Sequence, residues 1–545
     1  MKTSSQTALH VVPSGDWAAK NLLRLLLLTV AAFLIMGYHP GLEDDAFYLA
    51  AIKRNLNPTL FPHDAEFFRL QFQATIFDKL IAWSVRLTHL PLAWAALLWQ
   101  LSAIFLLLHG CWRISRRCFS EPPAQWAAVT MITALLTLPV TGTGLNLADQ
   151  YLHPRNLAGA AIVAAIVAVL DRRAWLACLC LAFAFANHAI MGAFGISFCI
   201  FLWWTLSRQT PSALPMAVAA LAPQGWMFEP SSDAWRQAAA TRSFYFLGRW
   251  EWYEWLGVFA PLILIDIFRR TLKHRAESAG DGPALRPFVT ALLYFGVFQT
   301  IIGLAIMLPP SLERLRPFEP MRYLHLVYLM FFLLVGALLG RYVLSTKDGR
   351  HPESSRSSGG AKDLARIERV AGEGRSRARL FRWALLFVPL GAIMFYSQRQ
   401  MYPATERIEW PGASSKNSWL QAFVWIRQNT PPDALFALDP HYVKLPGEDY
   451  HGFRALAERS VLADYVKDGG MAARVPSLAP RWLREVNAQT GWQKFGASDF
   501  QRLKEEFGVS WVVLSRADVE FSNPLPGLMT CPYANDEVKV CRLNQ

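Results

Sequence analysis

From the N-terminus to about residue 397, hydrophobic residues occur in long blocks that short charged runs separate. A membrane-spanning helix requires about 20 consecutive, mainly apolar residues. The blocks predict about eleven such helices, near residues 22–38, 91–112, 124–141, 156–170, 174–188, 190–206, 213–223, 256–268, 287–308, 322–343 and 382–397. The chain is therefore predicted to be a mainly α-helical, polytopic membrane protein.

Beyond residue 397 the pattern changes to that of an α/β domain. The stretch "NSWLQAFVWIRQNTPPDALFALDP" predicts a helix, a Pro-Pro turn and a short buried strand. The stretch "SDFQRLKEEFGVSWVVLSR" predicts a helix that begins at Ser498 or Asp499 and ends at Gly508, followed by a strand. Two more strands are predicted in "RSVLADY" and "DEVKVCRL". We therefore predict a transmembrane domain over residues 1–397 and an α/β domain over residues 398–545.

Residues 345–381 separate the last two apolar blocks with a segment rich in Ser, Gly and charged residues. Such a composition cannot bury enough apolar surface to fold alone. We predict that this segment is a disordered, basic linker on the cytoplasmic side.

The distribution of charge predicts the orientation. The chain has a formal net charge of +13, but its Lys and Arg residues cluster in short runs between apolar blocks, which argues against nucleic-acid binding. With a cytoplasmic N-terminus, the dense runs "RISRRC", "DRR" and "RRTLKHR" and the segment 345–382 all fall on one side, as the positive-inside rule requires. The loop 39–90 and everything beyond residue 397 then face outward. In a bacterium this is the periplasmic side of the inner membrane.

Ionisable residues in the predicted outer loops are the candidate site. A carboxylate can remove a proton from an acceptor hydroxyl as a general base, and arginine binds phosphate through two hydrogen bonds. Asp44 and Asp45 are the candidate catalytic residues because they lie directly after the first predicted span. The candidate substrate-binding residues for a phosphorylated lipid are Glu43, His63, Asp64, His153, Arg155, His188, Arg249 and Arg322.

Each of these residues also has a structural interpretation. Asp44 or Asp45 stands where a carboxylate would cap the helix predicted in "DDAFYLAAIKRNL". The arginines could form salt bridges between loops or reach lipid headgroups. His188 could form a hydrogen bond between two spans.

The seven cysteines do not form a metal-binding pattern. Five lie in or beside apolar blocks, where cysteine usually acts as a small buried hydrophobe. Cys531 and Cys541 stand alone in the C-terminal domain, ten residues apart across a predicted turn, and outside the cytoplasm this favours a disulfide. No zinc-binding spacing, nucleophile elbow or phosphate-binding glycine loop occurs in the sequence.

The motif "LEDDAFY" in the first outer loop resembles the acidic motif of the GT-C glycosyltransferase superfamily, whose members are polytopic enzymes that use polyprenyl-phosphate-linked sugars. The number of predicted spans and the outer C-terminal domain are similar too. The stretches "DDAFYLAAI", "YLHPRNLAG" and "FANHAIMG" resemble parts of bacterial multi-pass proteins associated with that superfamily. The resemblance implies that Asp44 or Asp45 is the base and that the substrate enters between the outer loops and the membrane.

The sequence departs from some members of that superfamily. It has no "WWDYG"-type stretch, so an oligosaccharyltransferase is not expected. Its second outer loop has one acid, Asp149, in place of an acidic pair, so the metal-independent members fit better and a bound divalent metal is doubtful.

The leading hypothesis is a glycosyltransferase in contact with the lipid bilayer and a polyprenyl-phosphate-linked sugar, with no nucleic-acid partner. The alternative is a non-catalytic envelope assembly or export factor on the same scaffold. A transporter ranks last, because paired broken helices and repeat symmetry are missing from the sequence.

Overall fold

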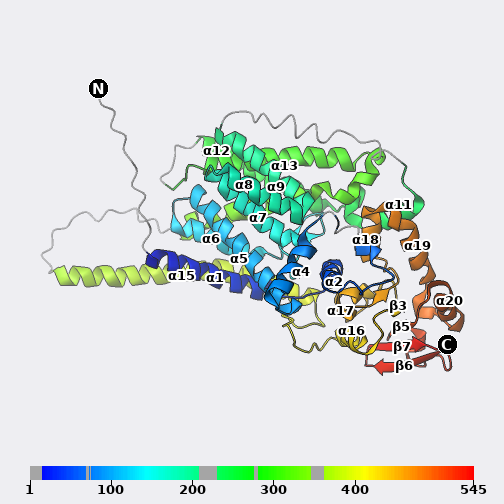
Figure 1. Ribbon diagram of the computed structural model, residues 1–545. Helices are drawn as coiled ribbons and strands as arrows, with labels where there is room; N and C mark the ends of the chain where they lie inside the picture. Colours follow the sequence, from blue (N-terminus) through cyan, green and yellow to red (C-terminus); the bar gives the residue numbers. More distant parts are fainter. Residues whose placement is uncertain are drawn as a thin grey trace.

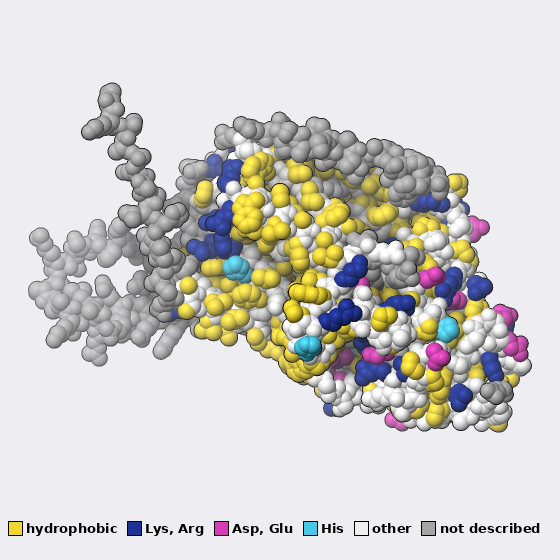
Figure 2. All heavy atoms as spheres, viewed as in Figure 1, with side chains coloured by type: hydrophobic (Ala, Val, Ile, Leu, Met, Phe, Trp, Pro, Cys, Tyr) yellow, Lys and Arg dark blue, Asp and Glu magenta, His cyan; other side chains and the backbone are white. Residues whose placement is uncertain are grey.

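Helices make up most of the structure, and its main sheet lies near the C-terminus, at the lower right of Figure 1. The computed structural model describes residues 15–68, 73, 75–207, 230–274, 280–344 and 361–544. Hydrophobic side chains cover much of the helical part, whereas charged side chains are more frequent over the C-terminal part (Figure 2).

Five helical segments of the described chain are long and apolar enough to cross a membrane. They are Ala18–Met36 within α1 (Gly15–Met36), α5 (Leu92–Cys118), α9 (Ala189–Ser207), α13 (Leu285–Met307), and Pro320–Tyr342, which contains η5 (Pro320–Tyr323) and α14 (Leu324–Leu339). Two shorter apolar helices, α7 (Pro154–Leu170) and α8 (Ala174–Asn187), pack beside them. Leu23 and Leu27 of α1 are more than half exposed, which suits a surface in contact with lipid. The chain is a multi-pass membrane protein.

The predicted spans agree with these helices to different degrees. The spans at 91–112, 190–206, 287–308 and 322–343 fall within candidate membrane helices, give or take a residue at their ends. The span predicted at 213–223 lies outside the described residues. The total of about eleven spans therefore remains a prediction.

Two predicted spans have different bounds in the structure. The block 124–141 forms α6 (Pro122–Leu135), which ends earlier because a hairpin of β1 (Pro139–Val140) and β2 (Leu145–Asn146) follows it. The block 256–268 lies within the longer helix α12 (Trp252–His274). The hairpin forms one wall of the cavity described below.

Helix α15 (Ala361–Met401) includes the last predicted span, 382–397, and packs along α1 (Figure 1). It also includes residues 361–381, which the sequence predicts to be disordered; the other part of that predicted linker, 345–360, lies outside the described residues. The stretch "AKDLARIERVAGEGRSRARL" is polar but rich in Ala, Leu, Arg and Glu, which are strong helix formers. Polarity alone was therefore a poor guide to its structure.

Short helices between the membrane helices carry many of the polar residues. They are α2 (Asp45–Leu56), α4 (Phe77–Thr88), α11 (Asp233–Ala240), η2 (Ser243–Tyr245), η3 (Leu247–Arg249), η4 (Pro310–Phe318) and η6 (Gly340–Leu344).

The C-terminal part is built around a five-stranded sheet with the order β4-β3-β5-β7-β6. Strand β3 (Leu435–Ala437) is parallel to β4 (Ser460–Val461) and to β5 (Trp511–Ser515), whereas β7 (Val538–Leu543) is antiparallel to β5 and to β6 (Met529–Ala534). The helices around it are α16 (Ser418–Asn429), η7 (Tyr442–Lys444), α17 (Phe453–Ala457), α18 (Lys467–Arg474), η8 (Pro476–Leu478), α19 (Ala479–Ala488), η9 (Trp492–Lys494), α20 (Ala497–Phe507) and η10 (Val519–Phe521).

Both faces of the sheet are buried, because side chains alternate along each strand. Trp511 and Val513 of β5 share a hydrophobic cluster with α16, whereas Val512 and Leu514 share another cluster with α20. The predicted strands in this part and the end of α20 at Gly508 are confirmed. A disulfide joins Cys531 on β6 to Cys541 on β7.

The loop after α1 is anchored to segments that follow it by hundreds of residues. Leu42 forms a β-bridge with His451, and Tyr38 forms one with Ile408. The carboxylate of Glu409 lies 2.9 Å from Nδ1 of His39 and 3.3 Å from Nε2 of His451. The position of the acidic loop therefore depends on the C-terminal part of the chain.

Candidate functional site

The two adjacent aspartates at the start of α2 have different surroundings. Asp45 is 4% exposed, and its Oδ2 accepts a hydrogen bond of 2.6 Å from the backbone N–H of Gly41. Burial raises the pKa of Asp45 to about 7. Asp44 occupies the N-cap position of α2, but its side chain makes no capping hydrogen bond and instead lines a cavity. Asp45 therefore shapes the loop, whereas Asp44 is available for chemistry.

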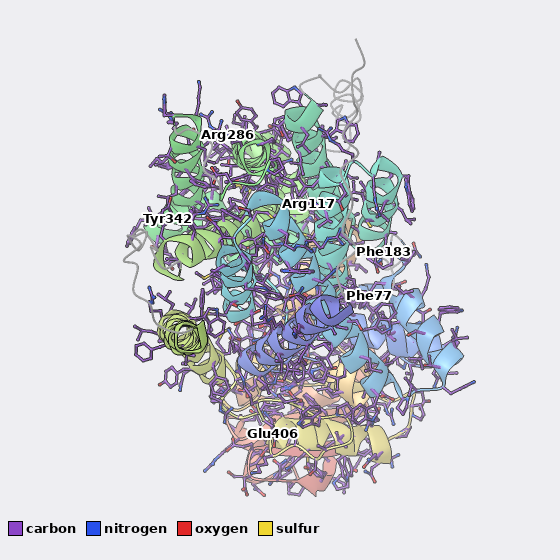
Figure 3. The ribbon with its side chains drawn as sticks, turned by 90° about the vertical axis from the view of Figure 1, so that its left-hand side faces the viewer. Phe77, Arg117, Phe183, Arg286, Tyr342 and Glu406 are labelled. Carbon is purple, nitrogen blue, oxygen red and sulfur yellow. A yellow bond between two sulfur atoms is a disulfide. The ribbon has the colours of Figure 1, made fainter. Side chains whose placement is uncertain are left out.

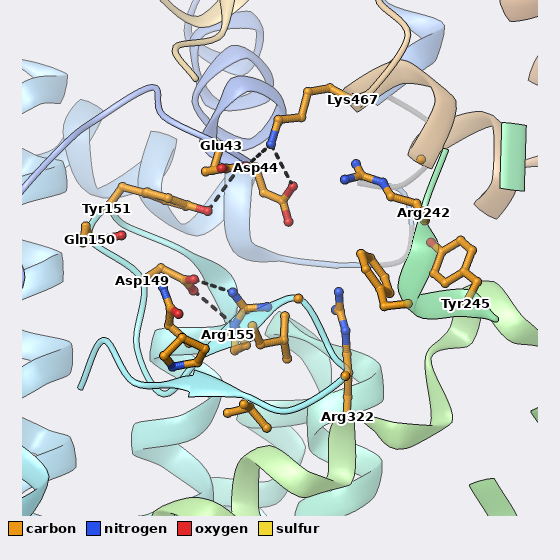
Figure 4. A pocket seen from close by; sticks show the side chains of 18 of the residues that line it. Glu43, Asp44, Asp149, Gln150, Tyr151, Arg155, Arg242, Tyr245, Arg322 and Lys467 are labelled. Atoms are coloured by element: carbon orange, nitrogen blue, oxygen red, sulfur yellow. Dashed lines mark hydrogen bonds and ion pairs between the residues drawn. The ribbon is translucent and has the colours of Figure 1, made fainter. Parts of the chain in front are cut away.

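The cavity beside Asp44 has a volume of about 530 Å³ and is lined by segments from both parts of the chain. Figure 4 shows acidic and basic side chains that converge on it from opposite walls. The hairpin β1–β2, the loop before α7, η2 and α18 all contribute to its wall. Its ionisable lining residues include Glu43, Asp44, Asp149, Glu254, Arg155, Arg242, Arg322, Lys467 and Arg474.

Lys467 controls the charge of Asp44. It is 2% exposed; its Nζ forms an ion pair with Glu43 and lies 3.7 Å from Oδ1 of Asp44. Burial alone would raise the pKa of Asp44, but Lys467 and then Arg242 outweigh it and hold the pKa well below its usual value. Asp44 is therefore an anion at neutral pH.

A buried ion pair fixes the opposite wall. The Nε of Arg155 donates a hydrogen bond of 3.1 Å to Oδ2 of Asp149, and its Nη2 pairs with Oδ1 of the same carboxylate. The remaining guanidinium nitrogen, Nη1 of Arg155, is buried without a hydrogen-bond partner among the described residues. Nε of Arg474 is also buried without a hydrogen-bond partner among the described residues, whereas Nη2 of Arg474 lies 2.8 Å from Oε1 of Glu319. Buried guanidinium donors without an acceptor are suited to bind an anionic group.

The guanidinium of Arg242 faces the same cavity (Figure 4) and makes no hydrogen bond or ion pair with the described residues. It can approach α18 closely because position 470 is glycine. A Cβ atom added to Gly470 would lie 2.5 Å from Nη2 of Arg242. The sequence of α18 thus leaves room for a cation that is free to bind a ligand.

A second cavity of about 320 Å³ adjoins the first. The two share Tyr48, Arg322 and Arg474 in their walls, and the second is mainly apolar and extends to Ala189 and Ile190 at the start of the membrane helix α9. An anionic group held by the arginines could therefore carry an apolar chain toward the membrane.

The structure brings together five of the residues that the sequence singled out. Glu43, Asp44, Arg155 and Arg322 line the first cavity, and His188 lines the second together with Arg322. Four of them come from elements that are distant in the sequence, namely the start of α2, the start of α7, the start of α9 and η5.

The other predicted site residues do not reach either cavity. Besides Asp45, these are His63, Asp64, His153 and Arg249. Nδ1 of His153 accepts the backbone N–H of Arg155 at 2.9 Å and so caps α7, and Nε2 of His63 bonds to the carbonyl of Asp433 at 3.1 Å.

Asp64 and Arg249 also have structural partners. Asp64 is 1% exposed and pairs with Nε of Arg454, which also binds Asp468 through two hydrogen bonds of 2.9 Å. Arg249 is exposed, stacks over Phe246 and donates a hydrogen bond of 3.1 Å to a backbone carbonyl. Asp64 thus links the first outer loop to the C-terminal part of the chain, whereas Arg249 stabilises its own segment.

Sequence reasoning missed Lys467 and Arg474, which lie at the two ends of α18. They are seven residues apart, which places them on one face of a helix. The signal was present in "KDGGMAAR", where two cations flank a pair of glycines inside a helix, a position where glycine is costly unless another group approaches closely. Nothing in that stretch indicates that its neighbour is a loop more than 400 residues away.

Among the described residues, no group of three or more His, Cys, Asp or Glu side chains is arranged to hold a metal ion.

Replacement of Lys467 by methionine is expected to shift the acid limb of activity to higher pH. The pKa of Asp44 is depressed in the folded state, so the wild-type carboxylate stays ionised above pH 4 and becomes protonated only as the pH falls through the depressed value. Loss of the nearest cation raises that pKa, and the ionised form is then lost earlier on acidification. The measurement is the pH dependence of the sugar transfer proposed below.

Lys444→Met is the matched control, because Lys444 is an exposed lysine of the same region and does not line the cavity. An acid limb that stays in place in Lys467→Met, or that moves equally in both variants, would contradict the control of Asp44 by Lys467.

Comparisons with known proteins give remote similarities. Residues 417–473 match the model of a family described as a domain of unknown function, DUF6798. A search of curated proteins finds no match.

Two solved structures resemble the chain over 92% of its length and 70% of theirs. One is the archaeal oligosaccharyltransferase AglB from Archaeoglobus fulgidus in complex with an inhibitory peptide and a dolichol-phosphate, with 11% identity and a TM-score of 0.43. The other is the Archaeoglobus fulgidus oligosaccharyltransferase in the apo form, with 12% identity and a TM-score of 0.38. These structures belong to the GT-C superfamily that the sequence motifs resemble. The likeness is remote, and nothing about substrate or activity follows from it.

Proposed function

We propose that this chain is a GT-C-like integral membrane glycosyltransferase, which transfers a sugar from a polyprenyl-phosphate-linked donor to an acceptor hydroxyl on the outer face of a bacterial inner membrane. In this proposal, residues 1–397 form the transmembrane domain with a cytoplasmic N-terminus. Residues 398–545 form the periplasmic domain, whose helix α18 closes the site.

The observation that carries the proposal is a carboxylate that faces unpaired cationic donors across one cavity. Asp44 lies on one side, and Arg242, Nη1 of Arg155 and Nε of Arg474 have no acceptor among the described residues. Charged donors of this kind bind phosphate strongly. A phosphate bound there would carry its polyprenyl chain along the apolar second cavity toward the membrane helices.

In the proposed reaction the acceptor hydroxyl attacks the anomeric carbon of the sugar. A bond forms between the acceptor oxygen and that carbon, and the bond from the same carbon to the phosphate oxygen breaks. Asp44 receives the proton of the hydroxyl, and polyprenyl phosphate leaves with the electron pair. The arginines stabilise the negative charge that develops on the leaving phosphate.

The low pKa of Asp44 fits this role once the donor is bound. A carboxylate with a strongly depressed pKa is a weak base. The phosphate of the donor would share Lys467 and Arg242, the cations that depress the pKa of Asp44. Its negative charge would raise that pKa and make Asp44 a better proton acceptor only when substrate is present.

Binding of a polyprenyl monophosphate tests the anion site directly. We expect Arg242→Gln to weaken binding about 10- to 100-fold, because a hydrogen bond to a charged group contributes about 1.5–3 kcal/mol. Arg249→Gln is the matched control: Arg249 lies in the same segment but outside the cavity, and its removal should leave binding unchanged. The affinity can be measured by native mass spectrometry of the purified chain in detergent.

Equal affinity of the Arg242→Gln variant and the wild-type chain would contradict the phosphate site. An absence of binding by the wild-type chain would favour the non-catalytic envelope factor as the function of this scaffold.

A further inference from the structure

A carboxylate held between two histidines lies behind the acidic loop, and none of the three residues lines either cavity of the candidate site. Oε1 of Glu409 is 2.9 Å from Nδ1 of His39 and 3.3 Å from Nε2 of His451. The three side chains are 11%, 2% and 0% exposed, respectively. Figure 3 views the molecule from the left-hand side of Figure 1 and labels Glu406, which lies just before Glu409 in the segment that leads from α15 to α16. We call Glu409, His39 and His451 the histidine cluster.

The contacts of His451 require both of its ring nitrogens to carry a proton. Nδ1 lies 2.9 Å from the backbone carbonyl oxygen of Glu448, and a carbonyl oxygen can only accept a hydrogen bond. Nε2 faces the carboxylate of Glu409, which is also only an acceptor when it is ionised. A neutral imidazole has a single donor, so it would lose one of these two contacts inside a fully buried site. His451 is therefore an imidazolium in this arrangement.

The charges of the histidine cluster stabilise one another. Burial alone would lower the pKa of His451, but Glu409 outweighs it and raises the pKa to about 9. Burial alone would raise the pKa of Glu409, but His451 and then His39 outweigh it and hold the pKa below its usual value. The titratable groups that face this ion pair from the segments around it are Tyr38 and His39 after α1, Glu406 before Glu409, and Glu448 before His451.

These shifts define the pH range in which the ion pair exists. The pKa of His451 is higher in the folded chain than in the unfolded chain, where it is about 6.5. Its stabilising contribution is therefore complete below about pH 6.5 and is lost as the pH rises through about 9. The pKa of Glu409 is lowered, so its contribution is lost only as the pH falls below the usual range of a glutamate. The cluster is thus sensitive to alkaline pH.

The acidic loop runs between the two charged residues of this ion pair. On one side, the backbone N–H of Glu409 donates a hydrogen bond of 2.9 Å to the carbonyl of Tyr38. On the other side, the backbone of His451 forms a β-bridge with Leu42, two residues before Asp44. The ion pair therefore joins the two segments that hold the acidic loop.

The backbone of these segments is strained. Glu43 has a φ of 52°, and Asp449 and Tyr450 have φ values of 60° and 65°, in the left-handed region that residues other than glycine rarely adopt. The N–H of Glu43 donates a hydrogen bond of 2.9 Å to the carbonyl of Tyr450, so the strained residues of the two segments are in contact. Such conformations persist only where surrounding contacts hold them. Loss of one anchor would let the loop relax.

We propose that Glu409, His39 and His451 form a latch that holds the acidic loop with Asp44 in the cavity, and that loss of a proton from His451 opens this latch. The consequence for catalysis, which rests on the proposed function, is an alkaline limit on sugar transfer at a pH where Asp44 itself remains ionised. The latch is a property of the fold and can be tested without the reaction.

Hydrogen–deuterium exchange of the full-length chain in detergent is that test. Exchange in peptides that cover residues 38–48 is compared at pH 7 and pH 10, after correction for the intrinsic pH dependence of amide exchange. We expect it to be at least about tenfold faster at pH 10, since the raised pKa of His451 favours the closed loop at pH 7 and that preference is gone above about pH 9. Peptides from β5 should stay protected, which separates release of the loop from unfolding.

Variants identify the groups responsible. Glu409→Gln should move the transition by about one pH unit or more toward neutrality, because the carboxylate that favours the charged ring is gone. His451→Gln should exchange rapidly at both pH values and show no transition. His441→Gln is the matched control, because His441 is 51% exposed and lies 3.6 Å from Asp439, outside the histidine cluster. It should behave as the wild-type chain does.

Three results would overturn the latch: an unchanged transition in Glu409→Gln, the same change in His441→Gln, or an equal loss of protection in β5. Glu448 also titrates nearby, since burial raises the pKa of its carboxyl to about 8. A transition that disappears in Glu448→Gln would therefore overturn the role of His451. An absence of sugar transfer at every pH would contradict the proposed function, whereas the exchange data would still decide on the latch.

Discussion

Replacement of Asp44 by asparagine is expected to lower the rate of sugar transfer by about 10²- to 10⁴-fold, the usual contribution of a positioned general base. The variant keeps the size of the side chain but removes the proton acceptor. Because Asp44 makes no capping hydrogen bond, its loss should leave the fold and the thermal midpoint nearly unchanged. The measurement is transfer of label from a panel of radiolabelled polyprenyl-phosphate sugars to envelope acceptors.

The neighbouring aspartate supplies the control. Asp45→Asn should retain transfer within about tenfold, because the asparagine oxygen can still accept the hydrogen bond from Gly41. The contrast between the two variants is the test. Equal losses in both would mean that the loop as a whole, and not the Asp44 carboxylate, sustains the activity. Full activity of Asp44→Asn would exclude Asp44 as the base.

Arg454→Met is expected to produce the largest loss of stability, about 3–5 kcal/mol, because it leaves two buried carboxylates without a counter-ion. Asp64 and Asp468 are almost completely buried, and Arg454 contacts both. Asp64 belongs to the first predicted outer loop, whereas Asp468 belongs to α18, the helix that carries Lys467. The ion cluster therefore joins the two parts of the chain that form the candidate site. The free energy of unfolding can be measured by denaturant titration in detergent.

The matched control for this prediction is Arg427→Met. Arg427 is 39% exposed and lies 3.6 Å from Glu458, so its removal should cost less than about 1 kcal/mol. The triple variant Asp64→Asn/Arg454→Met/Asp468→Asn should recover part of the loss, since the buried charges are then removed together. A loss in Arg454→Met no larger than that in Arg427→Met would contradict the cluster's role.

The sequence identifies Asp44 and Asp45 as candidates but does not show which of them faces the cavity. The acids stand out because three follow one another directly after an apolar block, and their place at the start of a helix is also legible. The two side chains point in different directions from the start of the helix, so only one of them can face the cavity. Which one does so depends on the hydrogen bond of Asp45 to Gly41 and on the bridge between Leu42 and His451.

For the arginines, by contrast, the local sequence does not show which side chains belong to the candidate site. Arg155, Arg242 and Arg249 occur in loops of similar composition, and nothing in their local sequence distinguishes an ion-paired, an unpaired and an exposed guanidinium. The distinction arises from Asp149 beside Arg155, from Gly470 against Arg242 and from solvent around Arg249. In the same way, only the tertiary fold shows that Asp64 belongs to a buried ion cluster.

The sequence alone determined the features that depend on local pattern: the apolar blocks long enough for membrane helices, the α/β pattern after residue 397, and the end of α20 at Gly508. Those features follow from burial and backbone preference within about 20 residues. The tertiary structure decided the candidate site, because Asp44, Arg155, Arg242 and Lys467 converge on one cavity from elements spread over more than 400 residues. No local periodicity encodes which distant charges meet, since that depends on how the packed helices and the sheet place their loops.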